Sequence, residues 1–228
     1  MSRWFLAACF LMAACGKPSP ILEPTETVAG RTSTEWSVSW WQWAYAQPTT
    51  NHPLLYEGAG DFCSTGQPAA DAFFLGPTFG GSAVRSCTVP ANRTLIFPIT
   101  AGEDGDYPTD SMQRTSAQLM QATKANMDSV SSLHLELDGE PLIGGAVADF
   151  ARFRQTASFS VVVPNIPDSI VRTYFMIDFA GTIPLAVSDG YWILMRPLSP
   201  GTHTLKFSAE LSVPAPFQSS VEYRLTVK

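Results

Sequence analysis

Hydrophobic and polar side chains alternate along most of the second half of the chain. The period is two in FRQTASFSVVVP (residues 153–164), in HTLKFSAEL (residues 203–211) and in SVEYRLTV (residues 220–227), and the leucines of residues 133–137 repeat it. Such a period places the apolar side chains on one face of a β-strand. Because Asp-Gly, Pro-Gly and proline-rich turns separate these segments, the pattern predicts a mainly β body that is β-sandwich-like.

Further segments predict strands without a clear alternation. YFMIDFAG (residues 174–181) and GYWILM (residues 190–195) are apolar almost throughout, which is typical of central strands that are covered on both faces. Residues 72–99 are rich in strand-forming side chains and are interrupted by GPT, GG and PAN turns. We therefore expect strands on both sides of those turns.

The stretch EWSVSWWQWAYAQP (residues 35–48) has a helical period and holds four of the six tryptophans of the chain. A cap at Ser33 or Thr34 and a stop at Pro48 predict an N-terminal helix between them. The helix is apolar over most of its circumference, which is typical of a helix packed inside a protein. Its main apolar face consists of Trp36, Trp40, Trp43 and Ala44.

A neighbouring face of this helix carries Trp41 and Tyr45, and two hypotheses remain open for it. If the face meets another layer of protein, these rings extend the core. If it is exposed, the rings form an aromatic platform that stacks on the sugar rings of a glycan, or an apolar patch for an envelope protein or the membrane surface. Trp41 and Tyr45 are therefore candidate ligand-binding residues.

A second helix is predicted in the middle of the chain. Residues 111–130 have an amphipathic pattern, and Thr109 or Asp110 precedes them as a cap. The predicted fold class is thus mainly β with two helices, one rich in tryptophan and one amphipathic.

The first residues, MSRWFLAACFLMAACGKPSP, have the pattern of an export signal, in which one positive charge precedes an apolar run too short to span a bilayer. LMAAC resembles the lipobox of bacterial lipoproteins, where small residues precede a cysteine that receives the lipid. The resemblance implies a signal peptide at residues 1–14 and an extracytoplasmic protein anchored to a membrane through lipid on Cys15. Gly16, directly after the lipid cysteine, resembles the residue found at this position in lipoproteins that are sorted to the outer membrane or cell surface. Secretion with ordinary cleavage nearby is the alternative.

The remaining chain divides into a tether and one domain. Residues 15–32 contain several prolines and little periodicity, which predicts a flexible tether, and residues 33–228 are expected to form a single globular domain. The composition, 45% hydrophobic and 15% charged, is that of a globular protein. A formal net charge of −6 argues against a nucleic acid as partner, because binding to phosphates needs a basic surface.

The four cysteines predict one disulfide. Cys9 lies in the signal and Cys15 takes the lipid, which leaves Cys63 and Cys87 as a pair. In an oxidising compartment the two are expected to bond, which would stabilise the fold by roughly 3.5 kcal/mol.

An acidic segment, GEDGDYPTD, suggests a metal site. Its four carboxylates are hard oxygen ligands of the kind that calcium prefers, although their spacing is not that of an EF-hand. A solvated acidic loop in front of the second helix is the favoured interpretation of this segment, with calcium binding as the alternative, and no other cofactor is indicated. The candidate calcium ligands are Glu103, Asp104, Asp106 and Asp110.

Catalytic chemistry has a weaker signal in this sequence. There is no GxSxG nucleophile elbow, and the histidines are His52, His134 and His203. The expected function is non-catalytic binding, of a glycan or an envelope protein. The alternatives are a secreted hydrolase whose loop-built site uses the acidic loop with His52 or His203, and a structural component of the envelope.

Several blocks, namely WWQWA, FCSTGQ, FFLGPTFGG, RSCTVPANRTLIFP, DGYW and PLSPGTHTLKF, resemble a family of secreted bacterial proteins. The block with the paired cysteines is the most specific part of this resemblance. It implies a shared fold and carries no function over to this chain.

Overall fold

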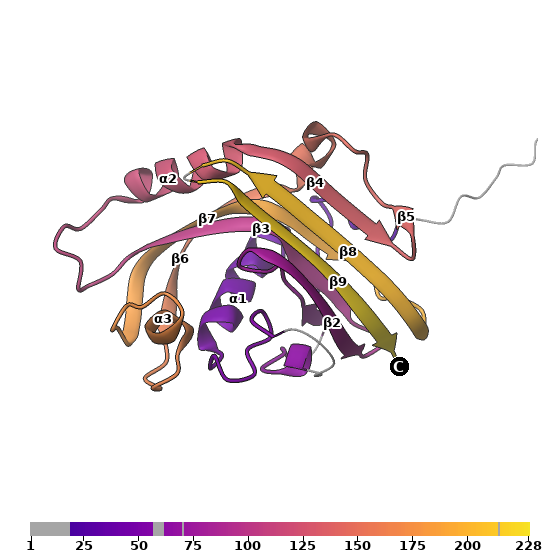
Figure 1. The fold of residues 1–228 in the computed structure, drawn as a ribbon, viewed down its shortest axis with the longest axis horizontal. Helices are drawn as coiled ribbons and strands as arrows, with labels where there is room; N and C mark the ends of the chain where they lie inside the picture. Colours follow the sequence, from indigo (N-terminus) through magenta and orange to yellow (C-terminus); the bar gives the residue numbers. More distant parts are fainter. Residues whose placement is uncertain (1–18, 57–61, 70, 214) are drawn as a thin grey trace, which may run out of the picture.

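The computed structural model describes residues 19–56, 62–69, 71–213 and 215–228, and the predicted signal peptide and Cys15 lie outside these residues. Two β-sheets face each other (Figure 1). In spatial order, the four-stranded sheet contains β1 (Ala72–Phe74), β3 (Thr94–Asp106), β7 (Gly181–Met195) and β6 (Arg154–Val163). The five-stranded sheet contains β2 (Gly81–Val89), β9 (Phe217–Val227), β8 (Gly201–Leu211), β4 (Val130–Leu137) and β5 (Glu140–Pro141). The mainly β, sandwich-like fold class is confirmed.

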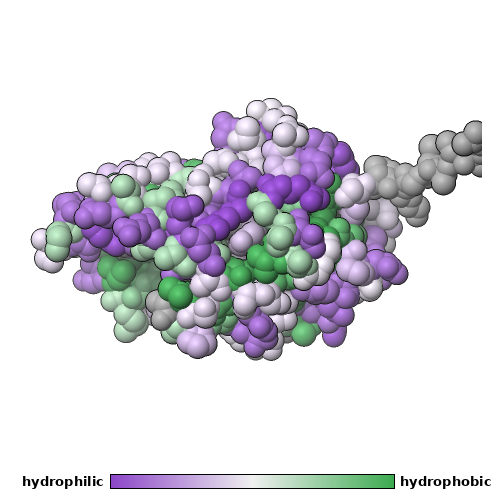
Figure 2. Space-filling view, turned by 90° about the horizontal axis from the view of Figure 1, so that it is seen from above, coloured by the Kyte–Doolittle hydropathy of each residue, from purple (hydrophilic) through white to green (hydrophobic). Residues whose placement is uncertain are grey.

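The helices lie on both sides of the four-stranded sheet. Helix α1 (Ser33–Ala46) covers its outer face, and α2 (Ser116–Asp128) lies against β3 and β7 from the opposite side (Figure 1). A short α3 (Ile170–Thr173) and two 3-10 helices, Phe62–Ser64 and Val147–Phe153, complete the elements. Among the described residues, no helix combines the length and the apolar character needed to span a bilayer. On the face that carries α2 and β4, hydrophilic residues surround smaller hydrophobic areas (Figure 2).

Two strand pairs are parallel within otherwise antiparallel sheets. β1 pairs in parallel with β3 over three residues only, and β2 pairs in parallel with β9 along its whole length. β9 is consequently an interior strand, with β2 on one side and β8 on the other. On the β1 side, β3 has no strand partner within the described chain after Ile96, and its pairing with β7 shifts register between Pro98 and Thr100. The rest of β3 therefore forms a free edge.

The alternation of side chains along β3 and β7 builds two cores. Phe97 and Ile193 face the second sheet, where Phe97 stacks on Phe207 with 4.7 Å between the ring centroids. Ile96 and Trp192 face α1 instead. Since both faces of these strands are covered, GYWILM is apolar throughout and is a central strand as expected.

The prediction of a strand in YFMIDFAG is wrong. Residues 174–180 follow α3 as a turn and a loop, and β7 begins only at Gly181. The backbone N–H groups of Tyr174 and Phe175 both bond to the carbonyl of Ile170, and that of Ile177 bonds to Val171. Local bonds that close a short helix thus replace the ladder of a strand.

The four tryptophans of α1 are buried, with exposed fractions between 2% and 7%. Each indole N–H has a partner: Trp36 donates to the Val28 carbonyl, Trp40 to Leu75, Trp41 to the Ser188 hydroxyl and Trp43 to Thr65. These bonds remove the cost of burying a polar N–H and fix the orientation of each ring. The helix begins one or two residues earlier than predicted, because its cap is Thr32, which forms a capping box with Glu35.

Other boundaries also differ from the sequence predictions. The second helix begins at Ser116 rather than near residue 111, because its cap is Thr115, which pairs with Gln118 in a capping box. Within the tether expected at residues 15–32, the described part from residue 19 onward lies on the body. Ile21 and Leu22 are buried there, and the N–H of Leu22 bonds to the carbonyl of Leu194.

The predicted disulfide is present. Cys63, in the first 3-10 helix, is bonded to Cys87 on β2, and both side chains lie in the core between the sheets. The bond joins the loop before β1 to the edge of the five-stranded sheet.

Candidate functional site

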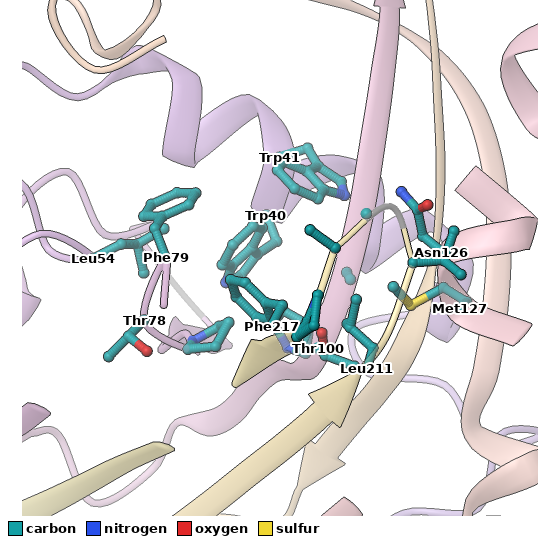
Figure 3. Close-up of a pocket in the computed structure, with 17 residues that line it drawn as sticks. Trp40, Trp41, Leu54, Thr78, Phe79, Thr100, Asn126, Met127, Leu211 and Phe217 are labelled. Carbon is teal, nitrogen blue, oxygen red and sulfur yellow. The ribbon is translucent and has the colours of Figure 1, made fainter. Parts of the chain in front are cut away.

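Two cavities lie along the free edge of β3. The first has a volume of about 320 Å³ and lies where β1 has ended, beside Pro98 and Thr100, between which the pairing of β3 with β7 shifts register. Helix α1 supplies Trp40 and Trp41 from one side, and α2 supplies Met127 (Figure 3). Leu211 at the end of β8 and Phe217 at the start of β9 close the remaining side (Figure 3). The first cavity is therefore built from both layers of the fold.

Few polar groups reach the first cavity. Its polar side chains are Thr78, Thr100 and Asn126, and none of its lining residues is charged. The tryptophan walls are held by their indole hydrogen bonds and by an edge-to-face contact between Trp40 and Trp41, whose ring centroids are 5.0 Å apart. Such walls give a cavity that exists before any ligand enters.

The structure does not show the exposed platform considered for Trp41 and Tyr45. Their side chains are 7% and 3% exposed, and their ring planes are inclined by 62° rather than coplanar. A second layer does cover this face, because Phe79 and Phe175 pack against the same cluster. Both residues nonetheless line cavities, so they remain part of the candidate site as walls.

The second cavity, of about 310 Å³, continues along the same edge. Trp41, Phe79 and Ala101 line both cavities. The second one adds Tyr45 from α1 and Phe175 from the loop after α3. Further along β3 it includes Glu103, Asp104 and Gly105, and Tyr107 follows the end of the strand. Aromatic rings and two carboxyl groups thus meet in this cavity.

Glu103 is the unusual group of the site. Ala101 packs into the cluster around α1, and Glu103, two residues further along β3, lies on the same side. Its Oε2 accepts a hydrogen bond of 2.5 Å from the Tyr45 hydroxyl, whereas its Oε1 is buried and has no partner among the described residues. Burial raises the pKa of Glu103 to about 7, against the lowering effect of the Tyr45 bond. The side chain therefore gains or loses a proton near neutral pH.

The two tyrosines beside Glu103 stay protonated. Burial and the neighbouring Glu103 carboxylate raise the pKa of Tyr45 well above its ordinary value, and the same two causes raise the pKa of Tyr107 to about 12. At neutral pH both hydroxyls are hydrogen-bond donors.

The acidic residues proposed as calcium ligands are not gathered into one site. Asp104 pairs with Arg114 at 2.7 Å, Asp106 accepts the backbone N–H of Arg114, and Asp110 accepts that of Tyr107. The segment is not a loop as expected, because β3 continues through Asp106. Glu103 accepts a hydrogen bond from the Tyr45 hydroxyl instead. Across the described ranges, no three Asp, Glu, His or Cys residues are grouped as a metal site.

His52 is bonded at both ring nitrogens. Its Nδ1 accepts the N–H of Leu54 and its Nε2 lies 3.0 Å from the Ala44 carbonyl, with 1% of the residue exposed. Burial lowers the pKa of His52 to about 4, so the ring is neutral. The two hydrogen bonds of this ring join α1 to the following loop. Neither ring nitrogen is left free to accept a proton as a general base.

His203 lies in an arrangement that has the residue types of a catalytic triad. Its Nδ1 is 2.7 Å from Asp138, and its Nε2 is 3.0 Å from the Ser199 carbonyl and 3.5 Å from the Ser199 hydroxyl. Because Nε2 donates to the carbonyl, it cannot take the proton of the hydroxyl. Ser199 is exposed and lines neither cavity. The contacts of His203 with Asp138 and Ser199 stabilise the turn between β7 and β8.

Sequence reasoning missed the pairing of Tyr45 with Glu103 and the roles of Phe79, Phe175 and Phe217. Glu103 was considered as a calcium ligand and as part of the acidic loop of a hydrolase site, but not as a partner of Tyr45. Phe79 lies in a glycine-rich turn where one aromatic residue gives little signal. Scans against protein-family models, curated proteins and solved structures each found no match to this chain.

Proposed function

We propose that this protein is a non-catalytic binding protein that holds a small, largely apolar molecule along the free edge of β3. In this proposal, lipid on Cys15 attaches the protein to a membrane outside the cytoplasm, at the outer membrane or the cell surface. The observation that carries the proposal is the first cavity beside Trp40 and Trp41.

The size and lining of this cavity support a small ligand. A volume of about 320 Å³ lies at the lower end of the range found for small-molecule sites. Its walls are aromatic and aliphatic, and the release of water from such a surface favours binding of an apolar group. A component with a purely structural role in the envelope has no need of such a cavity.

The same lining argues against a glycan at this place. Each sugar hydroxyl removed from water needs a hydrogen-bond partner, and the cavity offers only a few polar side chains. Trp41 and Tyr45 are not coplanar and exposed, as stacking on a sugar ring from solution would require. An apolar ligand fits this lining better.

Non-catalytic binding is also favoured over hydrolysis. A loop-built hydrolase would use His52 or His203. The ring nitrogens of both residues form hydrogen bonds with backbone groups. Neither lines the first or the second cavity.

The test is a binding titration with decan-1-ol and with a panel of glycans, followed by tryptophan fluorescence and calorimetry. The form used for the titration begins at Gly16, so that it lacks the predicted signal peptide and the lipid-bearing cysteine. We expect decanol to bind and to change the fluorescence, and the glycans to have no effect. Binding of a glycan without decanol would contradict the proposal.

A matched pair of glycine variants locates the ligand. A Cβ on Gly102 would meet only Met127, at 3.8 Å, so Gly102→Leu places a side chain into the first cavity. Gly145→Leu adds the same side chain in open space. Gly102→Leu should abolish decanol binding and Gly145→Leu should leave it unchanged. Equal affinities of the two variants would place the ligand elsewhere.

A further inference from the structure

The second cavity has aromatic rings on several sides. Trp41 and Tyr45 are 6.3 Å apart and inclined by 62°, Tyr45 and Phe175 are 6.3 Å apart and inclined by 40°, and Phe79 meets Phe175 at 80°. Rings at such different inclinations cannot stack on one flat ligand. They surround a small volume from several sides, as in the sites that bind ammonium groups, where the electron-rich ring faces attract the cation.

A residue that lines this cavity, Glu103, carries a buried acceptor without a partner within the described chain. Oε1 of Glu103 has no hydrogen-bond partner among the described residues, and a buried carboxylate oxygen without a partner is costly. Arg114, whose charge acts on Glu103, is used elsewhere, because it donates to Asp104 and to the carbonyl of Gly105. No lysine or arginine of the described residues lines this cavity. A positively charged group from outside the chain would provide the missing partner.

We propose that the second cavity binds the ammonium group of an amphipathic amine, with Glu103 as counter-ion and the rings of Tyr45 and Phe175 as walls. The apolar part of the same molecule lies in the first cavity. The assignment of the apolar part rests on the function proposed above, whereas the ammonium site stands on the second cavity alone.

The continuity of the two cavities supports one ligand with two parts. They follow each other along β3, the first at Pro98–Gly102 and the second at Ala101–Gly105, and they share Trp41 and Phe79 as walls. An apolar chain in the first cavity would thus extend toward Glu103. An anionic head group is disfavoured there, because it would meet both Glu103 and Asp104.

The experiment compares four probes: decyltrimethylammonium, decan-1-ol, decyl sulfate and tetramethylammonium. We expect decyltrimethylammonium to bind about ten-fold or more tightly than decanol at pH 8, and decyl sulfate to bind more weakly than either. Glu103→Gln should remove the advantage of the ammonium and leave decanol binding in place. Glu140→Gln, an exposed residue on β5, changes the net charge equally and should change nothing.

The outcomes separate the two proposals. If decanol binds as tightly as decyltrimethylammonium, or Glu103→Gln has no effect on the difference, the ammonium site is wrong and the apolar binding function stands. If tetramethylammonium alone binds and depends on Glu103, the ammonium site stands and the apolar function is wrong. If none of the probes binds, both are wrong.

A measurement on the unmodified protein keeps the test valid if Glu103→Gln does not fold. The groups that face Glu103 are Tyr45, Tyr107, Asp104 and Arg114. Protonation of Glu103 below about pH 7 should remove the counter-ion, so the advantage of decyltrimethylammonium over decanol should fall between pH 8 and about pH 5. A preference that is constant over this range would overturn the proposal.

Discussion

The substitution Glu103→Gln is expected to stabilise the protein at high pH and to have little effect at low pH. The folded state holds the proton of Glu103 up to a pKa of about 7, compared with an ordinary value of 4.5 that applies to the unfolded chain. As the pH rises, the unfolded state therefore loses this proton first. The stability that the protonated carboxyl provides is present below about pH 4.5 and is lost as the pH rises through 7.

The size of the effect follows from the shift. A difference of 2.5 between about 7 and 4.5 corresponds to roughly 3 kcal/mol of unfolding free energy. Glutamine has a similar shape and no charge, so Glu103→Gln should avoid this loss. At pH 8 the variant is expected to have a Tm about 6–12 °C above that of the parent chain. Near pH 4.5 the two should melt within a few degrees of each other.

Thermal unfolding followed by circular dichroism across this range measures the difference between the two chains. His52 also titrates in this pH range, but it makes the protein more stable as the pH rises, because burial lowers its pKa to about 4. Both chains contain His52, so its contribution cancels in the difference between them. Glu140→Gln is the control and should shift the stability by less than about 0.5 kcal/mol at any pH. A Glu103→Gln variant that is no more stable at pH 8 than at pH 4.5, relative to the parent, would refute the reasoning.

Three further predictions concern stability. Burial lowers the pKa of His203, but its bonds to Asp138 and to a backbone carbonyl outweigh this and raise it, so the pair stabilises the fold below about pH 6.5. In urea unfolding, Asp138→Asn should cost at most about 1 kcal/mol at pH 5.5 and less at pH 8.5; the reverse order would contradict this sign. Replacing Cys63 and Cys87 by serine should lower the unfolding free energy by roughly 3.5 kcal/mol, and an unchanged urea midpoint would contradict it. Asp189→Asn, which leaves Arg154 without its fully buried partner, should cost about 3–5 kcal/mol in the same assay; a loss below about 1 kcal/mol would show that the pair is dispensable.

The sequence was a good guide wherever one periodicity determines the structure. The alternation in residues 203–211 and 220–227 predicts β8 and β9, and the wholly apolar GYWILM predicts a strand covered on both sides. It was a poor guide where tertiary pairing overrides local character. β3 continues through GEDGD because its residues pair with β7, with Ala101 opposite Gly190 and Asp106 opposite Leu185.

The candidate site depends on contacts that no local pattern encodes. Tyr45 and Glu103 are 58 residues apart in sequence, and their hydrogen bond exists because α1 packs across the β3 edge. The tryptophans of α1 were correctly expected to be buried by default. That Trp41 would at the same time line two cavities follows only from the early end of β1 and the register shift in β3.

The parallel pairing of β2 with β9 has a consequence for the order of assembly. β2 and the disulfide it carries belong to the first half of the chain, but the neighbour of β2 in the sheet is the segment Phe217–Val227. No native five-stranded sheet can form until that last strand inserts between β2 and β8. Contacts between such distant segments make folding slow, and they leave the chain open while it is being synthesised. The proposal of export gives this order of assembly a use, because the five-stranded sheet cannot close before the last strand has been synthesised.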